Sequence, residues 1–273
     1  MKHSQRIPTL LAIGAMCFSL IATIGAAQRR AKPPRSRTSR GSPVFLDLSI
    51  KVGKSSVWLK GARISPKTNY LEIGSPEKGQ DGDTLVGFQA RYEASVVLSG
   101  GFLKSFYPPT PLGFVKHGGE ILNRGVTSDL LTGVLLASRR SVRIERYEND
   151  ACSSAWSDCL QSGPLLVLQG QPALPTRDEV HLKSTQAAID GRYQRAFVAL
   201  LPNGDAILGV TGEIGLLDLQ TFLVTPPDQG GLGCTDAINL SGAGSAGLLV
   251  RASGKTMSVN TVDMFLPNAI VTH

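Results

Sequence analysis

Cysteine and histidine are scarce in this 273-residue chain, and neither is spaced as in a metal site. There are four of each; no two cysteines form a CxxC pair, and the histidines are scattered along the sequence. Structural zinc sites need clustered Cys and His ligands. The sequence therefore predicts no metal site, and it leaves open whether the protein uses a metal or another cofactor.

Long apolar runs are missing except at the amino terminus. Lys2 and Arg6 precede an uncharged stretch over residues 10–25, and small residues close it at Gly25-Ala26-Ala27. A positive start, an apolar centre and a small-residue end are typical of a secretory signal. The run is long for a cleaved signal, and a membrane span needs about 20 apolar residues. We therefore interpret residues 1–27 as a signal peptide or an uncleaved signal anchor. We expect an exported protein, periplasmic, secreted or anchored at the outer face of the membrane.

Acidic residues are absent from residues 28–43, where six Lys or Arg lie among Pro, Ser and Gly. Such a segment cannot bury a core, so we expect a disordered basic stem. Together with Lys2 and Arg6 it holds eight of the 28 basic residues, which leaves 20 basic and 21 acidic residues after it. A near-neutral domain lacks the basic face of a nucleic-acid-binding protein, so no nucleic-acid partner is expected. Membrane contact is expected only through residues 1–40, and only if the signal is uncleaved.

Three cysteines follow the signal segment: Cys152, Cys159 and Cys234. An exported protein meets an oxidising compartment, in which disulfides form. Cys152 and Cys159 flank the short loop SSAWSD and are the natural pair. Cys234 is then left over, and we expect it to be buried.

Short apolar runs separated by Gly, Pro, Asn and Asp fill residues 44–273, a pattern typical of strands and turns. We expect one α+β domain, strand-rich, with a central mixed sheet and few helices. A hairpin is predicted at Pro202–Asp205 and a helix at 215–224, and 127–137 alternatively holds one short helix. The predicted strands are 45–51, 57–64, 94–98, 112–115, 121–122, 134–137, 142–147, 165–169, 196–200, 206–210, 237–240, 248–250 and 269–271.

Four clusters have residue types suited to ligand binding: Ser99–Phe102, Gly163–Leu165, Arg195 and Asn239–Gly247. Paired glycines allow a sharp turn and close approach of a ligand. An arginine can bind phosphate or carboxylate with two hydrogen bonds. Successive N–H groups in a glycine-rich loop can bind an anion. Each cluster also has a purely structural interpretation, as a turn or, for Arg195, a surface salt bridge.

Taken in order along the chain, these clusters resemble the phosphodiester glycosidase family. The resemblance covers about residues 90–273, and animal members of this family remove N-acetylglucosamine from a sugar phosphodiester. The similar segments are 99–102, 112–113, 163–165, 195, 215–224, 233–234, 239–245 and 266–269.

The resemblance implies a site for a glycan or sugar phosphodiester, with Arg195 gripping the phosphate. Its implied members are Ser241 and Arg195 at catalytic positions, and Ser99, Gly100, Gly101, Asn239, Gly242, Gly244 and Ser245 in ligand binding.

The departures from the family pattern concern three positions. This chain has Ser99 in place of Asn, Ser241 in place of Asp and Ala243 in place of Gly. Glycoside hydrolysis normally uses carboxylates, and losing positioned acid–base catalysis costs about 10²–10⁴-fold in rate. Asp236 and Glu213 are carboxylates nearby in sequence that could substitute. Two hypotheses follow: a hydrolase acting on a sugar phosphodiester of the cell envelope, or a catalytically impaired relative, a pseudoenzyme, that binds phosphorylated glycan without cleaving it.

Overall fold

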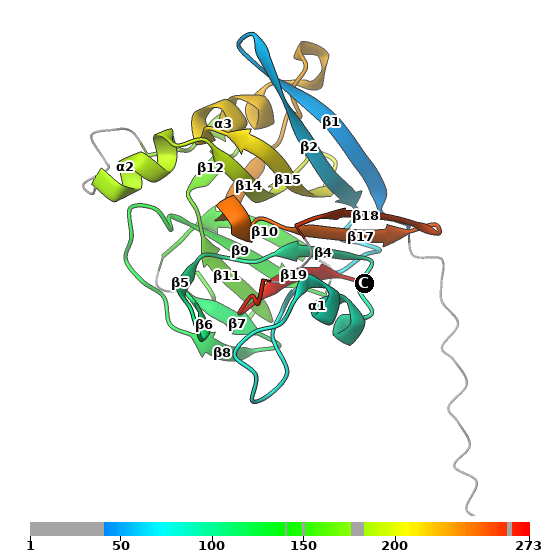
Figure 1. Ribbon diagram of the computed structural model, residues 1–273, viewed down its shortest axis with the longest axis vertical. Helices are drawn as coiled ribbons and strands as arrows, with labels where there is room; N and C mark the ends of the chain where they lie inside the picture. Colours follow the sequence, from blue (N-terminus) through cyan, green and yellow to red (C-terminus); the bar gives the residue numbers. More distant parts are fainter. Residues whose placement is uncertain (1–40, 140, 149–150, 176–182, 261–263) are drawn as a thin grey trace, which may run out of the picture. The chain divides into compact units, whose positions relative to one another are not determined.

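Antiparallel pairing of short strands builds the fold of this protein (Figure 1), as seen in a computed structural model. The described residues are 41–139, 141–148, 151–175, 183–260 and 264–273. The predicted signal segment and the predicted stem up to residue 40 lie outside them. Internal contacts divide the chain into Met1–Thr38 and Ser39–His273, and the fold below is that of the second unit.

The largest sheet has seven strands in the order β1-β2-β15-β14-β16-β12-β13. They are β1 (Val44–Val52), β2 (Ser55–Ile64), β12 (Leu165–Leu168), β13 (Gln171–Pro172), β14 (Tyr193–Leu200), β15 (Ala206–Ile214) and β16 (Asp236–Gly242). The Asn-Gly turn between β14 and β15 is confirmed, because Asp205 N–H donates to Asn203 Oδ1 (3.0 Å) and Gly204 has φ +86°.

Two five-stranded sheets and a separate two-stranded hairpin make up the rest of the strands. The order β10-β9-β11-β7-β8 joins β7 (Val115–His117), β8 (Glu120–Asn123), β9 (Gly133–Ser138), β10 (Ser141–Arg146) and β11 (Asp158–Ser162). The order β18-β17-β4-β19-β3 joins β3 (Leu71–Gly74), β4 (Val96–Ser99), β17 (Leu248–Ala252), β18 (Lys255–Val259) and β19 (Ala269–Thr272). The hairpin pairs β5 (Leu103–Phe106) with β6 (Pro109–Pro111).

The predicted central mixed sheet is wrong, although the strand-rich α+β character is confirmed. Every pair of strands among the described residues is antiparallel, and the strands are divided among several sheets. Parallel neighbours need long crossover connections, usually helical. In the described part of the chain, seven pairs of consecutive strands are joined by short turns, which fold the chain back antiparallel, and the remaining pairs join strands distant in the sequence.

Three α-helices lie within the described residues: α1 (Leu85–Tyr92), α2 (Lys183–Asp190) and α3 (Leu216–Val224). The prediction of a helix at 215–224 is confirmed by α3, whereas the alternative helix at 127–137 is wrong because β9 occupies residues 133–138. Helix α1 begins where Thr84 Oγ1 accepts a hydrogen bond from Gly87 N–H (3.0 Å). None of the described helices has the length and apolar character to cross a membrane.

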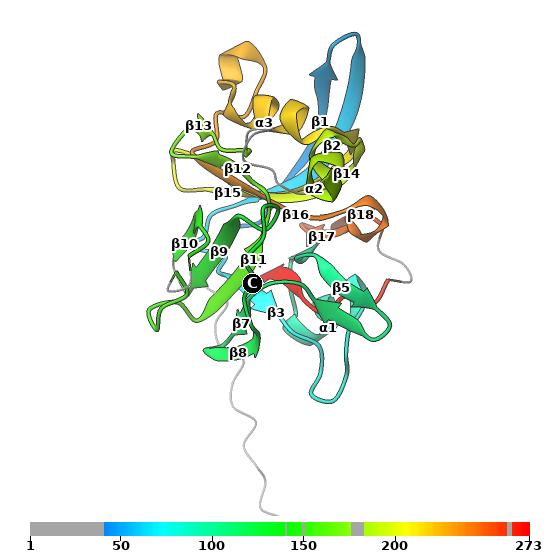
Figure 2. The ribbon, with the colours of Figure 1, turned by 90° about the vertical axis from the view of Figure 1, so that its left-hand side faces the viewer.

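The main core lies where the three large sheets meet, and helices cover two outer faces (Figure 2). Fully buried side chains from each sheet contact one another there, including Leu98, Leu135, Val198 and Ile270. Helix α3 covers the far face of the seven-stranded sheet, and α1 covers β4 and β19. Burying one such side chain stabilises the fold by about 1.5–3 kcal/mol.

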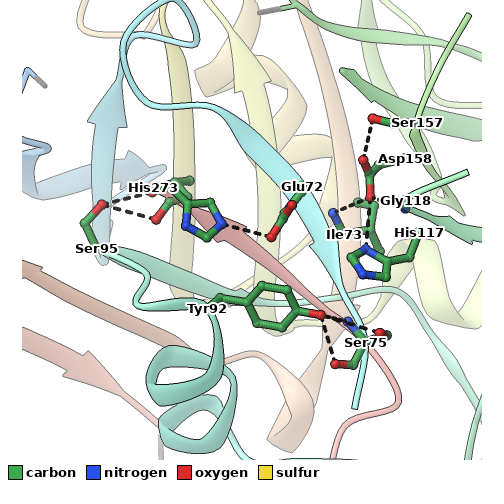
Figure 3. Close-up of polar contacts among 11 residues, drawn as sticks. Glu72, Ile73, Ser75, Tyr92, Ser95, His117, Gly118, Ser157, Asp158 and His273 are labelled. Atoms are coloured by element: carbon green, nitrogen blue, oxygen red, sulfur yellow. Dashed lines mark hydrogen bonds and ion pairs between the residues drawn. The ribbon is translucent and has the colours of Figure 1, made fainter. Parts of the chain in front are cut away.

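A buried carboxylate on β11 ties the sheet that contains β11 to β3 of the other five-stranded sheet (Figure 3). Asp158 Oδ1 lies 3.2 Å from Nδ1 of His117 and accepts from the N–H groups of Gly118 (3.3 Å) and Ile73 (3.4 Å). Its Oδ2 accepts from the Ser157 hydroxyl (2.6 Å). The neighbouring strand end is held separately, since Glu72 Oε1 lies 2.9 Å from Nε2 of the terminal His273.

The His117–Asp158 contact makes stability depend on pH. The hydrogen bond with Asp158 raises the pKa of His117 above 6.5, although burial opposes this. Burial works to raise the pKa of Asp158, but hydrogen bonds from His117, Ser157 and Gly118 outweigh it and hold that pKa below 3.8. The histidine's contribution is therefore complete below pH 6.5 and lost as pH rises through its folded pKa. The aspartate's contribution is present above pH 3.8 and lost as pH falls through its lowered pKa.

We predict that His117→Gln lowers the free energy of unfolding by about 1.5–3 kcal/mol at pH 5, the usual contribution of a hydrogen bond to a charged group. At pH 8.5 the cost should be clearly smaller, because the native imidazole is then neutral. Urea unfolding of both proteins at the two pH values measures this. An equal cost at pH 5 and pH 8.5 would contradict the assignment.

Candidate ligand site

Two serine hydroxyls join β4 of one sheet to β16 of another. The Oγ atoms of Ser99 and Ser241 lie 2.7 Å apart, and both residues are fully buried. Ser241 donates its only proton to the carbonyl of Ser245 (3.1 Å), so the proton between the two hydroxyls comes from Ser99. Ser99 Oγ also accepts from Gly247 N–H (3.0 Å). Both hydroxyls are thus committed within the protein.

The paired glycines after β4 allow the segment that carries Asn268 to approach the backbone closely. A Cβ atom on Gly100 would lie 1.8 Å from Oδ1 of Asn268 and 2.7 Å from its carbonyl oxygen. Gly101 N–H donates to that same Oδ1 (3.0 Å). The predicted turn therefore accommodates Asn268, which enters from the segment before β19, and both glycines are buried.

Asn239 brings the Gly163-Pro164 turn to the same place. Its Nδ2 donates to the carbonyls of Gly163 (2.7 Å) and Leu240 (2.8 Å), and its side chain is fully buried. Asn239 Oδ1 and Asn268 Nδ2 are buried atoms without a hydrogen-bond partner among the described residues. Buried polar atoms are normally paired, so two amide groups with unused hydrogen-bonding capacity lie among the converging motifs.

Arg195 is buried, only 3% exposed, and it is not the surface salt bridge that the structural interpretation proposed. Its Nη2 donates to the carbonyls of Ala188 (2.9 Å) and Gly191 (2.8 Å), at the end of α2. Its guanidinium lies 5.1 Å from the centre of the Tyr193 ring. Burial lowers the pKa of Arg195 to about 10, so it stays charged at neutral pH. Within the described residues no carboxylate pairs with this cation.

The backbone around Arg195 is irregular on both sides. In β14 the register with β15 shifts between Tyr193 and Arg195, and the register with β16 shifts between Arg195 and Phe197. Such bulges re-aim side chains and are common near binding sites. Arg195 pairs directly with Gly242, and a Cβ atom at that glycine would lie 3.6 Å from Nη1. The guanidinium therefore lies next to the start of the glycine-rich loop.

That loop forms a short 3₁₀ turn, η3 (Ala243–Ser245), that follows β16 directly. Ser245 Oγ donates to the carbonyl of Gly242 (2.6 Å), so this hydroxyl closes the turn. Ala243 has φ +51°, in the left-handed region that glycine adopts without strain. Ala243 and Gly244 are exposed, while Gly242 and Ser245 are half-buried.

A pocket of about 740 Å³ opens on this loop. Its lining residues are Tyr193, Gln194, Glu213, Ala243, Gly244, Asn260 and Met264. Asn260 Nδ2 donates to Oε1 of Gln194 and to the carbonyl of Ala246 (2.9 Å), which fixes two amide side chains on its wall. Of the catalytic and binding residues that the resemblance implies, only Gly244 lies on this lining.

The two carboxylates that sequence proximity suggested have different locations. Glu213 is exposed and lines the pocket with Gly244. Asp236 lies at the other end of β16, where Oδ1 accepts from Gln169 N–H (3.0 Å) beside a different cavity. Within the described residues no three His, Cys, Asp or Glu side chains come together as a metal site.

The cysteines predicted to pair are free thiols in this structure, as is Cys234, which is buried. Cys152 and Cys159 nevertheless lie within hydrogen-bond reach of each other, and this contact lowers the pKa of Cys159 and raises that of Cys152. The disulfide between them is not formed here and stays a prediction.

Comparison with known proteins identifies the family to which these converging motifs belong. A family model described as phosphodiester glycosidase matches residues 92–272. The chain belongs to the phosphodiester glycosidase family. Among curated proteins none matches it.

Solved structures share the fold of this phosphodiester glycosidase family member. A hypothetical protein from Synechocystis aligns with a TM-score of 0.67 and 15% identity, over 85% of this chain and 62% of its own. The catalytic domain of zebrafish N-acetylglucosamine-1-phosphodiester alpha-N-acetylglucosaminidase, auto-inhibited by its pro-peptide, aligns with a TM-score of 0.63 and 13% identity, over 85% of this chain and 82% of its own. A protein from Burkholderia pseudomallei K96243, described as a putative exported protein, aligns with a TM-score of 0.55 and 12% identity, over 80% of this chain and 74% of its own.

Sequence reasoning missed most of the pocket wall of this glycosidase-family domain. Tyr193 and Gln194 directly precede Arg195, so their place next to that arginine in the sequence was the available signal. Asn260 and Met264 have no such signal. Both residues follow β18, whose sheet is different from the one that contains β14, so no local pattern relates them to Tyr193 and Gln194.

The strained loop residue gives a direct test of this geometry. We predict that Ala243→Gly raises the free energy of unfolding by about 0.5–1 kcal/mol, since a left-handed conformation costs a non-glycine residue roughly 1–2 kcal/mol. Ala246→Gly is the matched control, because Ala246 is buried with φ −76° and should lose about 1 kcal/mol. Denaturant unfolding measures both. If both substitutions destabilise equally, the left-handed assignment at residue 243 is wrong.

Proposed function

We propose that this protein binds a sugar phosphodiester of the cell envelope in the pocket lined by Tyr193, Glu213 and Gly244, as an exported member of its family. The observation that carries the proposal is Arg195, a buried cation whose contacts are neutral carbonyls and the Tyr193 ring. A buried charge is stable only when it is compensated. An anion bound at the neighbouring loop would supply the missing negative charge.

The loop offers donors for that anion. Arg195 pairs with Gly242, so its positive charge lies close to the exposed backbone of Ala243 and Gly244. The first N–H groups of a helical turn lack partners within the turn, and a left-handed residue beside a right-handed one forms an anion-binding concavity. Phosphate is the anion that the family membership favours.

The rest of the pocket suits a sugar. Tyr193 is 43% exposed and offers an aromatic surface, while Gln194 and Asn260 present amide groups held by their own hydrogen bonds. A ligand pocket that mixes apolar surface with a few fixed polar groups is typical of small-molecule sites. The predicted signal segment would place this pocket outside the cytoplasm, where envelope glycans occur.

A second function, binding without cleavage, is favoured by the buried serine pair. The family pattern has Asn and Asp where Ser99 and Ser241 form their mutual hydrogen bond, and neither hydroxyl reaches solvent. This chain has therefore lost the carboxylate at its family position. Hydrolysis requires another acid or base in the pocket.

The test uses N-acetylglucosamine linked as its methyl phosphodiester, with the methyl glycoside of the same sugar as control. The purified protein should bind the phosphodiester at least tenfold more tightly, because a charge-assisted hydrogen bond contributes about 1.5–3 kcal/mol and about 1.4 kcal/mol is tenfold. Calorimetry measures the two affinities. Equal affinity, or no binding of the phosphodiester, would contradict the proposal.

A further inference from the structure

We infer that Glu213 is a catalytic residue of this chain: its carboxylate acts as the base in hydrolysis of the bound phosphodiester and replaces the carboxylate missing at Ser241. The inference rests on the proposed function, whose pocket Glu213 lines. The inference gives this chain a hydrolytic activity, although Ser241 at the family's Asp position would by itself favour binding without cleavage.

The position of Glu213 suits this role. It lies one residue before the end of β15, opposite the bulged stretch between Tyr193 and Arg195. Arg192 Nη2 donates to the backbone carbonyl of Glu213 (3.2 Å), which fixes the strand and leaves the carboxylate free of that guanidinium. Among the described residues that line the pocket, Glu213 is the one carboxylate, and it forms no ion pair with another described residue.

Asp218 is a neighbouring carboxylate that, unlike Glu213, forms an ion pair. Asp218 lies on the first turn of α3 and is paired with Arg192 at 3.5 Å. It does not line the pocket. Arg192 thus forms an ion pair with the Asp218 side chain and a hydrogen bond with the Glu213 backbone. The Glu213 carboxylate is therefore available to accept a proton, whereas that of Asp218 is paired.

One carboxylate is enough for this substrate class. Ordinary glycosidases need a second one, because the leaving sugar oxygen must be protonated as its bond breaks. The second pKa of a phosphate monoester is about 6, so this group leaves as a stable anion without taking a proton. Only the attacking water then needs assistance.

The step balances as follows. Glu213 takes a proton from a water molecule, and the water oxygen bonds to the anomeric carbon of the sugar. The bond between that carbon and the phosphate oxygen breaks, and its electron pair leaves with the phosphate monoester. Glu213 then releases the proton to solvent. Because this is a single displacement, the sugar is released with inverted anomeric configuration.

The experiment compares Glu213→Gln with Asp218→Asn in the purified protein, using the methyl phosphodiester of α-linked N-acetylglucosamine. Release of free sugar is followed together with binding by calorimetry. We expect Glu213→Gln to lower kcat by about 10²–10⁴-fold, the usual contribution of a positioned acid or base, with little change in affinity. Asp218→Asn should stay within a few fold of the wild type. Proton NMR of the first product should show the β-anomer.

The outcomes separate the two proposals. Binding without sugar release by the wild type overturns the catalytic role of Glu213 and leaves the binding function standing. Release that persists in Glu213→Gln, or a retained α-anomer, also overturns only the Glu213 assignment. Absence of binding overturns the proposed function itself. Unfolding midpoints of both variants check folding, and Glu213→Asp should keep part of the activity that Glu213→Gln loses.

Discussion

The hydrogen bond between Ser99 and Ser241 connects two sheets at the point where the family motifs meet. It joins the end of β4 to β16, and the N–H groups of Ser241 and Ser99 add backbone bonds to the carbonyls of Gly100 and Gly247. A carboxylate at residue 241 would need charge compensation in this buried place. Two hydroxyls need only each other, Gly247 and the Ser245 carbonyl. The serine pair is thus a neutral connection between the two sheets.

The buried serine pair leaves a different part of the loop open to solvent. With the serines closed off, the exposed part of the loop is Ala243-Gly244, one turn further along the chain. The pocket there is completed by Tyr193 from β14, the strand that carries Arg195, and by Glu213 from the neighbouring β15. Arg195 connects the two regions, because it caps α2 and lies beside Gly242. The cation therefore lies beside the start of the loop that lines the pocket, and no described carboxylate compensates its charge.

Much of the fold was predictable from local pattern, whereas its long-range arrangement was not. The Asn-Gly hairpin at 203–204 and helix α3 follow from turn chemistry and apolar spacing, and both were predicted. Strand β11 was missed because its polar residues look exposed. Gln161 is in fact fully buried, and its amide exchanges hydrogen bonds with the backbone of Phe114, Val126 and Leu131. No local pattern reveals such a partner set. For the same reason the sequence could name Ser241 and Arg195 but could not show that one is sealed and the other caps a helix.

We expect the ligand to occupy the pocket beside Gly244 and Glu213, outside the Ser99–Ser241 contact. A crystal structure of the protein with the methyl phosphodiester of N-acetylglucosamine tests it most directly. The phosphate should lie against the backbone of residues 243–244 with the anomeric carbon facing Glu213, and the hydrogen bond between the two serines should be unbroken. Ligand bound to the hydroxyls of Ser99 and Ser241, or in another cavity of the domain, would contradict it.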